Sequence, residues 1–214
     1  MTSPPAGAGP RLISIGHSNH EPGAFLDLLR GAGVAAVADV RSSPFSRRLP
    51  HFNGPQLEAF LRRNQLAYVY LGDFLGGRPR DDALYDDEGR VDYERVRTTA
   101  AFALGLERLL LAAEEGAVAM LCAEEDPLDC HRGLMITPAL VERGIAPLHL
   151  RRSGVETTDA MERRLLAETG QQRRLEPDLF TPAPDEEERR RVLADAYRMR
   201  ARRKAYRRDQ QGEG

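Results

Sequence analysis

The chain has 214 residues, of which 41% are hydrophobic and 30% charged, and its formal net charge at pH 7 is −2. A chain of this length can bury a core of its own, so it needs neither a disulfide framework nor a structural metal. No apolar run reaches the roughly 18 residues of a membrane span, no apolar signal-peptide core begins the chain, and there are only two cysteines. We therefore predict a cytoplasmic protein with no membrane partner.

The first third of the chain is predicted to alternate short apolar strands with amphipathic helices. Strands are expected at residues 11–15, 34–40 and 66–71, where apolar residues run almost without interruption. Helices are expected to begin at Pro22 and Pro55, because proline fits the first turn of a helix. The intervening polar, basic segment is expected to be a loop.

The middle of the chain continues the same alternation after a long insertion. Residues 72–90 are rich in glycine and charge and are predicted to form a long loop. A single helix is then expected over residues 92–115, followed by a strand at 117–122. A helix from about residue 130 to residue 143 and a fifth strand at 145–150 complete the series.

This pattern predicts a three-layer, Rossmann-like α/β domain over residues 11–152. The strands are continuous apolar runs, which is typical of a mostly parallel sheet covered by helices on both faces. Residues 1–10 are expected to form a disordered N-terminal tail. Residues 153–214 are expected to form a helical C-terminal extension without strands, with its best candidate linker in the proline-rich segment 181–184.

Polar residues follow three of the predicted strands, at the point where each strand ends. Ligands of open parallel sheets bind at the carboxyl ends of the strands, so we expect these residues to meet at one edge. They are Gly16, His17, Ser18 and Asn19 after the first strand, Asp39 and Arg41 after the second, and Cys122, Glu124, Cys130, His131 and Arg132 after the fourth. The opposite edge carries mainly glycine and small residues, and this contrast predicts a functional site.

Cys130 is the predicted nucleophile of this site. It lies near the start of a predicted helix, where the helix dipole and unpaired N–H groups stabilise a thiolate. His17 or His131 would act as the general base, because imidazole titrates near neutral pH. Cys122 is a candidate resolving thiol if the two sulfur atoms lie within bonding reach. The alternative is that both cysteines are packed as small apolar residues.

An anionic substrate is predicted from the arginines of the same set. Arg41 and Arg132 are expected to hold a phosphate, sulfate or carboxylate group, with Asp39 orienting a histidine or an arginine. Arg132 could instead cap the helix or pair with Asp39 or Glu124. The other residues predicted to contact the substrate are Gly16, Ser18, Asn19, Cys122 and Glu124.

A metal site is a further interpretation of the same residues. Four side chains offer soft or borderline ligands, namely His17, Cys122, Cys130 and His131. The spacing of the two cysteines and His131 is not a familiar zinc spacing, so no metal is assigned and the cofactor stays unknown.

Basic residues are concentrated near the C-terminus. Between Arg189 and Arg208 there are ten lysines and arginines and one acidic residue, so this segment carries +9 and the rest of the chain −11. Such a tail can bind nucleic acid, dock on the acidic body or present a solvated helix face. Apolar residues recur in it at helical spacing, which predicts a packed helix. They are Val192, Leu193, Ala196 and Tyr197.

Three segments together resemble the family of the domain of unknown function 488, over roughly residues 11–150. They contain a Gly-His-Ser-Asn turn in residues 13–19, an Asp-Val-Arg strand end in 38–44, and a Cys-His-Arg helix start in 121–132. The extension is also similar to that of longer members, in Asp178-Leu-Phe180, Ala196, Tyr197, Arg202, Arg203 and Tyr206. The resemblance implies the same α/β fold and a site at the strand ends, but no reaction.

We therefore predict a small enzyme, a thiol-dependent hydrolase or transferase. Its predicted substrate is an anion, for example one that resembles a nucleotide. The first alternative is a module that binds or processes nucleic acid, through the basic loop 41–51 and the basic tail. The second alternative is a metal-binding protein with cysteine and histidine ligands. The sequence leaves the oligomeric state open.

Overall fold

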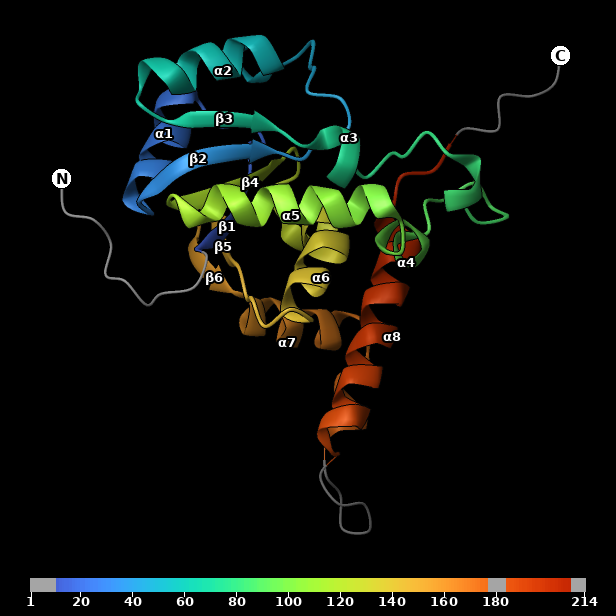
Figure 1. Ribbon diagram of the computed structural model, residues 1–214. Coiled ribbons are helices and arrows are strands. Elements are labelled where there is room, and N and C mark those ends of the chain that lie inside the picture. The colour runs from blue at the N-terminus through green and yellow to red at the C-terminus, as the bar shows by residue number, and fades with distance from the viewer. Residues whose placement is uncertain (1–10, 177–183, 209–214) are drawn as a thin grey trace, which may run out of the picture.

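A six-stranded mixed sheet forms the centre of the protein in the computed structural model, which describes residues 11–176 and 184–208 (Figure 1). The strands are β1 (Leu12–Gly16), β2 (Val34–Asp39), β3 (Ala67–Tyr70), β4 (Ala117–Cys122), β5 (Leu148–Arg151) and β6 (Gly154–Thr157). Their order is β3-β2-β4-β1-β5-β6, and every neighbouring pair is parallel except β5 and β6. The predicted α/β fold with a mostly parallel sheet is confirmed.

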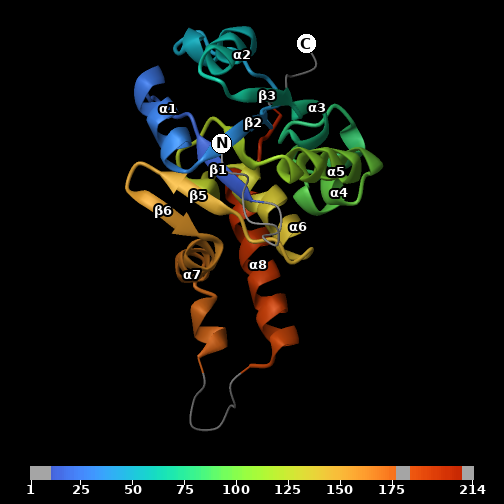
Figure 2. The same ribbon diagram turned by 60° about the vertical axis from the view of Figure 1, so that its left-hand side comes forward.

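Helices cover both faces of the sheet (Figure 2). They are α1 (Pro22–Gly31), α2 (Gly54–Arg63), α3 (Gly72–Leu75), α4 (Tyr93–Arg97), α5 (Ala100–Glu114), α6 (Thr137–Val141), α7 (Thr158–Glu168) and α8 (Glu186–Lys204). Helices α1 and α2 pack on one face, in a core of their own. The other helices contribute to a second, larger core on the opposite face.

Strand β4 shows why the sheet is buried on both faces. Its side chains point alternately to the two sides, and all of them are apolar. Val118 and Met120 belong to the core beneath α5, whereas Ala119 and Leu121 belong to the core beneath α1 and α2. An apolar run without alternation is therefore what a central parallel strand needs.

Two predicted elements are divided in the structure. The helix expected over residues 92–115 is two helices, because the hydroxyl of Thr99 accepts a hydrogen bond from the Phe102 N–H and caps a new helix, α5. The helix expected from residue 130 begins with a π-helical turn at Arg132–Ile136 and continues as α6. The predicted loop 72–90 contains α3 and leads to an isolated β-bridge between Tyr85 and Val91.

The prediction that the C-terminal extension lacks strands is wrong. Strand β6 pairs with β5 as an antiparallel hairpin at the edge of the sheet. It escaped prediction because it is short and polar, and its one large apolar side chain, Val155, is 62% exposed. The predicted boundary after residue 152 therefore falls inside this hairpin.

The rest of the described extension is helical and docks on the body. In α8, Val192, Ala196 and Tyr197 are buried, as their helical spacing predicts, and Leu193 packs against the larger core. The predicted N-terminal tail at 1–10, the family-like segment 178–180 and most of the predicted linker at 181–184 lie outside the described residues. In the part of the chain that the structure describes, no helix is long and apolar enough to cross a membrane.

Candidate functional site

The carboxyl ends of β1, β2 and β4 lie side by side at one edge of the sheet. The register pairs Gly16 with Cys122 and Asp39 with Leu121, so these strands end at the same level. The structure thereby brings together the three groups of polar residues that follow the strands in the sequence. These groups are far apart in the sequence but close in space, because β4 lies between β1 and β2 and pairs with both in parallel.

The turn after β1 is held against the segment after β4. The backbone N–H of His17 donates to the carbonyl of Cys122 at 2.9 Å, and that of Ser18 donates to the carbonyl of Ala123 at 2.8 Å. A Cβ atom on Gly16 would lie 1.6 Å from the carbonyl oxygen of Glu124. Glycine is therefore required at position 16 for the two segments to approach this closely.

At the end of β2, Asp39 and Arg41 form a buried ion pair. The Asp39 carboxylate accepts from Arg41 Nε at 2.8 Å and Nη2 at 2.5 Å, and also from the Tyr68 hydroxyl at 2.9 Å. Asp39 is fully buried and Arg41 is 6% exposed. Of the two partners expected for Asp39, the structure gives it the arginine. Among the described residues Arg41 Nη1 has no hydrogen-bond partner, and it is not closed off from solvent.

His131 lies between β2 and the end of β4. Its Nε2 is 2.8 Å from the carbonyl oxygen of Val40, which can only accept a hydrogen bond, so Nε2 carries the proton. In the neutral ring Nδ1 then has a free lone pair, and this atom lies 3.7 Å from the Cys122 sulfur. The same sulfur is 3.1 Å from Glu124 Oε2. Cys122 therefore has a proton acceptor on either side.

The surroundings of Cys130 disfavour its thiolate, in contrast to the stabilisation expected at a helix start. Burial raises the pKa of the Cys130 thiol well above its ordinary value, and the hydrogen bond with Cys122 raises it further, although Arg132 acts in the opposite direction. Cys130 lies two residues before the π-helical turn Arg132–Ile136, and its carbonyl accepts from the Leu134 N–H at 3.0 Å. Desolvation outweighs the positive surroundings, so Cys130 is a protonated thiol at neutral pH.

The Arg132 guanidinium donates hydrogen bonds to groups of the protein itself. Its Nη1 and Nη2 donate to the carbonyl oxygens of Glu124 and Glu125 at 2.6 and 2.7 Å. Its Nη1 also lies 2.9 Å from the Cys130 sulfur, and its Nε 3.3 Å from the Ser14 hydroxyl. The fully buried guanidinium thus fixes the loop after β4 from inside, and neither alternative ion pair, with Asp39 or with Glu124, is formed.

His17 is a buried, neutral imidazole. Its ring stacks on Phe52 at a centroid distance of 4.6 Å, and its Nδ1 lies 2.9 Å from the carbonyl oxygen of Ser18. Burial lowers the pKa of His17 to about 4, which makes it a weak base at neutral pH. Of the two histidines predicted as general bases, His131 is the one in contact with a thiol.

The remaining predicted residues lie at the outer rim. Asn19 and Glu124 are exposed, and Ser18 is half-buried. Ser18 has a positive φ of 43°, which turns the chain sharply after β1. The Asn19 side chain contacts Arg152, which lies beyond β5.

Three soft ligand atoms meet inside the edge. The sulfur atoms of Cys122 and Cys130 and a ring nitrogen of His131 all lie within 4.8 Å of one another, and all three residues are buried. His17, which the sequence offered as a fourth metal ligand, is not in this group. Both cysteines are free thiols. We call Cys122, Cys130 and His131 the thiol–imidazole cluster.

Sequence reasoning missed a second line of buried polar residues behind the cluster. The Ser14 hydroxyl lies 2.7 Å from His149 Nδ1, and His149 Nε2 lies 3.4 Å from the Thr158 hydroxyl. Burial lowers the pKa of His149 to about 3, so this ring is neutral. The signal was present in the sequence, because Ser14 and His149 each interrupt an otherwise apolar strand.

A large groove lies elsewhere in the described part of the molecule. It has a volume of about 1090 Å³ and lies among the residues of α4, α6, α7 and α8. Its lining mixes arginines with acidic side chains and includes Tyr93 of α4. Burial raises the pKa of Tyr93, and Cys130, Cys122 and Glu124 raise it further. We place the candidate site at the thiol–imidazole cluster, because its side chains can serve as nucleophile, base or metal ligand.

A family model described as the domain of unknown function DUF488 matches residues 21–137, which is more than half of the chain. Among solved structures, the chain is similar to a DUF442 protein of Shewanella putrefaciens CN-32 that is named as a candidate phosphatase. The two are 15% identical, with a TM-score of 0.36 over 89% of each chain. No curated protein matches the chain.

Proposed function

The chain belongs to the family of the domain of unknown function DUF488, and we propose that it is an enzyme that acts on a small anionic substrate. In this proposal Cys122 is the nucleophile, His131 is its general base and Arg41 binds the anion. The nucleophile is thus Cys122, and not Cys130 as the sequence alone suggests, because the raised pKa of Cys130 disfavours its thiolate.

The contact between Cys122 and His131 carries the proposal. A nucleophilic thiol needs a base within reach, and the base needs a group that orients it. Here the Cys122 sulfur is 3.7 Å from Nδ1, and the Val40 carbonyl holds the opposite nitrogen at 2.8 Å. The first distance is long for a hydrogen bond, as is common before a substrate is bound.

The buried pair of Asp39 and Arg41 supports an anionic substrate. Asp39 holds one edge of the guanidinium through Nε and Nη2 and leaves Nη1 free to donate. Arg41 directly follows Val40, whose carbonyl binds His131, so the free donors lie next to the cluster in the chain. A guanidinium fixed in this way can donate to a phosphate or carboxylate group with little loss of side-chain entropy.

The reaction that follows is a transfer through sulfur. The Cys122 S–H gives its proton to His131 Nδ1, and the sulfur attacks the electrophilic centre of the substrate. The bond to the leaving group breaks, and His131 returns the proton to that group. Water or a second substrate then attacks the group carried on sulfur and gives its proton to His131 while the bond between that group and sulfur breaks. The proton then passes from His131 to the Cys122 sulfur, which restores the thiol and the neutral imidazole. Water makes the enzyme a hydrolase, and another acceptor makes it a transferase.

Alkylation with iodoacetamide tests the nucleophile. We expect Cys122 to react about ten-fold faster than a free peptide cysteine at pH 7, as followed by mass spectrometry of the labelled peptide. The His131→Gln variant should lose this excess, because the glutamine amide can still donate to the Val40 carbonyl but provides no base.

The matched control is Cys130→Ser, which removes the other sulfur and keeps His131. It should leave the Cys122 rate within a factor of about two. A wild-type Cys122 that reacts no faster than the free peptide, or a rate that does not depend on His131, would contradict the proposal.

Metal binding is the second candidate function, and the grouping of three soft ligands favours it. Two thiolates and one imidazole form a set found in catalytic zinc sites, which keep a fourth position open. The Val40 carbonyl accepts a hydrogen bond from His131 Nε2 and so orients the ring, as carbonyl groups behind metal-binding histidines do. Zinc would bind the thiolate forms and release their protons.

Zinc titration against a chromophoric chelator, with elemental analysis of the purified protein, tests this candidate. Stoichiometric binding that is lost in Cys122→Ser, Cys130→Ser and His131→Gln, and kept in His17→Asn, is the expected result. Binding that survives in any of the first three variants, or absence of binding, would contradict it.

A further inference from the structure

The loop between β4 and the π-helical turn joins the residues of the thiol–imidazole cluster and contains Cys130. It runs from residue 123 to residue 130, with Cys122 before it and His131 after it. A short 3-10 helix, Pro127–Asp129, forms its centre, and the Asp126 side chain caps that helix by accepting from the Leu128 N–H at 2.9 Å. The position of Cys130 relative to Cys122 therefore depends on how this loop is held.

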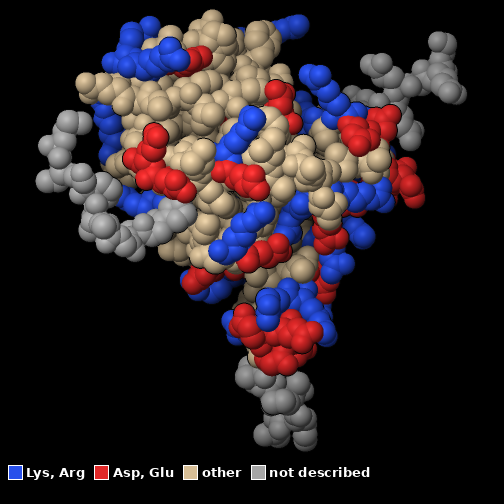
Figure 3. All heavy atoms as spheres, in the orientation of Figure 1, with Lys and Arg blue, Asp and Glu red and all other residues tan. Residues whose placement is uncertain are grey.

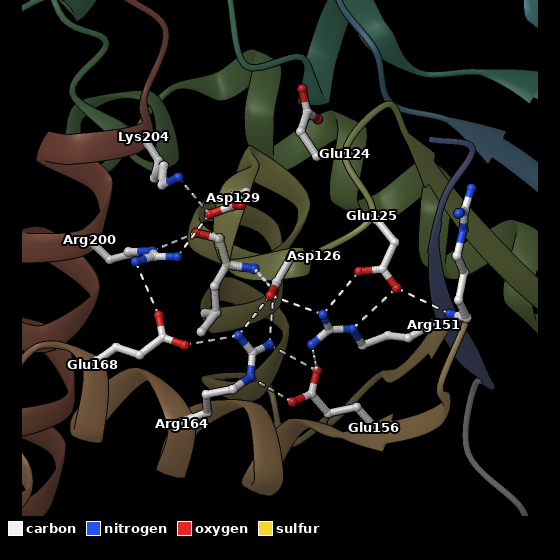
Figure 4. A network of polar contacts seen from close by, with 12 residues as sticks. Glu124, Glu125, Asp126, Asp129, Arg151, Glu156, Arg164, Glu168, Arg200 and Lys204 are labelled. Atoms are coloured by element: carbon white, nitrogen blue, oxygen red, sulfur yellow. Dashed lines mark hydrogen bonds and ion pairs between the residues drawn. The ribbon is translucent and has the colours of Figure 1, made fainter. Parts of the chain in front are cut away.

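Cations from the C-terminal part of the chain hold the outer side of this loop (Figure 4). Arg164 of α7 binds both carboxylate oxygens of Asp126, at 2.8 and 2.9 Å. Arg151 at the end of β5 binds Glu125 at 2.9 Å and Asp126 at 3.1 Å. Each acidic residue from 125 to 129 thus has a cationic partner from outside the loop. The partners of Asp129 come from α8.

Helix α8 supplies the remaining contacts. Arg200 donates through Nε to the Leu128 carbonyl at 2.9 Å and through Nη2 to Asp129 at 2.8 Å. Lys204 binds the same Asp129 oxygen at 3.0 Å. These cations belong to the segment that gives the chain its +9 tail, so part of the charge asymmetry is used within the molecule. On the face shown in Figure 3, basic and acidic groups lie next to one another over α7 and α8.

Two further carboxylates join these cations to one another. Glu156 of β6 binds Arg151 at 3.1 Å and Arg164 at 3.0 Å, and Glu168 of α7 binds Arg164 at 3.2 Å and Arg200 at 3.1 Å. The network therefore connects β6, α7 and α8 into one support for the loop. Burial acts to raise the pKa of Asp126, but Arg164 and the Leu128 N–H bind the ionised form and the pKa is lowered.

The end of the extension reaches the second segment that borders the cluster. A Cβ atom on Gly77 would lie 2.8 Å from the His131 ring, so the chain passes directly over that ring. Farther along, Val91 N–H donates to the Tyr206 carbonyl at 3.0 Å, and the Arg78 guanidinium stacks on the Tyr206 ring at 4.5 Å. The extension thus touches both segments that enclose the cluster.

We infer that the C-terminal extension positions the candidate site, and that Arg164 and Arg200 are the positioning residues that hold loop 123–130 in place and keep Cys130 at its end buried. This inference rests on the proposed function only in taking the cluster as the reactive centre. Both arginines lie outside residues 21–137, which the family model matches. Without them, the loop would keep its inner support by Arg132 and only the contacts of Arg151 and Lys204 on its outer side, and Cys130 would be exposed by local opening.

Hydrogen exchange and thiol labelling of the full chain test the inference. In Arg164→Met and in Arg200→Met, we expect amide exchange of residues 123–131 and alkylation of Cys130 to be about ten-fold faster than in the wild type. Arg164→Lys, which keeps the charge, should recover part of this protection.

Arg174→Met is the matched control, because Arg174 pairs with Asp195 at 2.8 Å within the extension and does not touch the loop. It should leave loop exchange unchanged. The inference is overturned if exchange at 123–131 is the same in Arg164→Met and Arg174→Met, or if it increases only together with exchange throughout the core. If loop exchange depends on Arg164 while Cys122 is unreactive in the wild type, the positioning role stands and the thiol chemistry falls.

Discussion

The charged groups at the strand ends and those around the C-terminal extension are stabilised in different ways. Asp39 and Arg41 are 0% and 6% exposed, and each has a fixed, bidentate partner. In the outer network, Arg164 and Asp126 are 27% and 21% exposed, and each is shared among several partners. A buried pair cannot turn to water when it is broken, whereas a half-exposed network can rearrange. The first arrangement fixes the Arg41 guanidinium, and the second links α7 and α8 to loop 123–130.

The largest effect should come from breaking the buried pair. Asp39→Ala leaves the Arg41 guanidinium without its counter-ion in the interior, so we expect the free energy of unfolding to fall by about 3–5 kcal/mol. Urea unfolding followed by circular dichroism measures it. The double variant Asp39→Ala/Arg41→Met should be more stable than the single variant, because no uncompensated charge remains. A single-variant loss below about 1 kcal/mol would show that Arg41 finds water.

Acid should destabilise the strand-end region before it affects the network. The pKa of His17 is lowered from 6.5 to about 4 by burial, so the unfolded chain takes up this proton first as the pH falls. The associated stability is complete above pH 6.5 and is lost towards pH 4, at about 1.4 kcal/mol per pH unit and about 3 kcal/mol in all.

His149 should contribute in the same direction, with its lowered pKa of about 3. The network carboxylates Asp126 and Glu156 have pKa values below their ordinary 3.8 and 4.5, so their stabilisation is lost only at lower pH. The free energy of unfolding, measured from pH 7 to pH 4, should fall with decreasing pH in the wild type. It should fall less steeply in His149→Gln. A flat profile in the wild type would contradict the assignment of neutral, buried imidazoles.

A smaller effect is expected for one arginine of the network. Arg164→Met should cost about 1 kcal/mol, because Arg151 continues to bind Asp126 at 3.1 Å. Removing Arg151 and Arg164 together should cost more than the sum of the two, by about 0.5–3 kcal/mol, since Asp126 then has neither partner. Strict additivity of the unfolding free energies would show that the two arginines act independently.

The smallest effect is expected at an exposed pair that belongs to neither region. Arg62 and Glu58 on α2 are 73% and 37% exposed and lie 2.8 Å apart. Glu58→Ala should change the free energy of unfolding by less than about 0.5 kcal/mol, as measured by the same urea titration. A loss as large as that of Arg164→Met would remove the distinction between the network and an ordinary surface pair.

The sequence was sufficient to predict that the carboxyl ends of the strands meet at one edge of the sheet. Continuous apolar strands alternating with helices require parallel pairing, and parallel pairing places the residues after Gly16, Asp39 and Cys122 at one edge. The helical docking of α8 was likewise visible in the spacing of its apolar residues. The division of the helix at Thr99 also had a signal, because a threonine ahead of an apolar run is a typical helix cap.

The environment of Cys130 could not be predicted in this way. Its position before a helix indicated an activated thiol, but its burial depends on a loop held by Arg164 and Arg200, which lie 38 residues beyond Asp126 and 71 residues beyond Asp129. No local pattern reports such distant contacts. Strand β6 was missed for a related reason, since a short polar strand is specified by its pairing partner β5 more than by its own sequence.

Whether the strand-end residues form one reactive, anion-binding centre can be decided by comparing two alkylating reagents on Cys122. The anionic iodoacetate normally reacts more slowly with a thiolate than the neutral iodoacetamide, because like charges repel. We predict the reverse preference at Cys122 in the wild type, and its loss in Arg41→Met, as measured by competitive labelling at pH 7. A slower reaction with iodoacetate in the wild type, as for a free cysteine, would contradict the account.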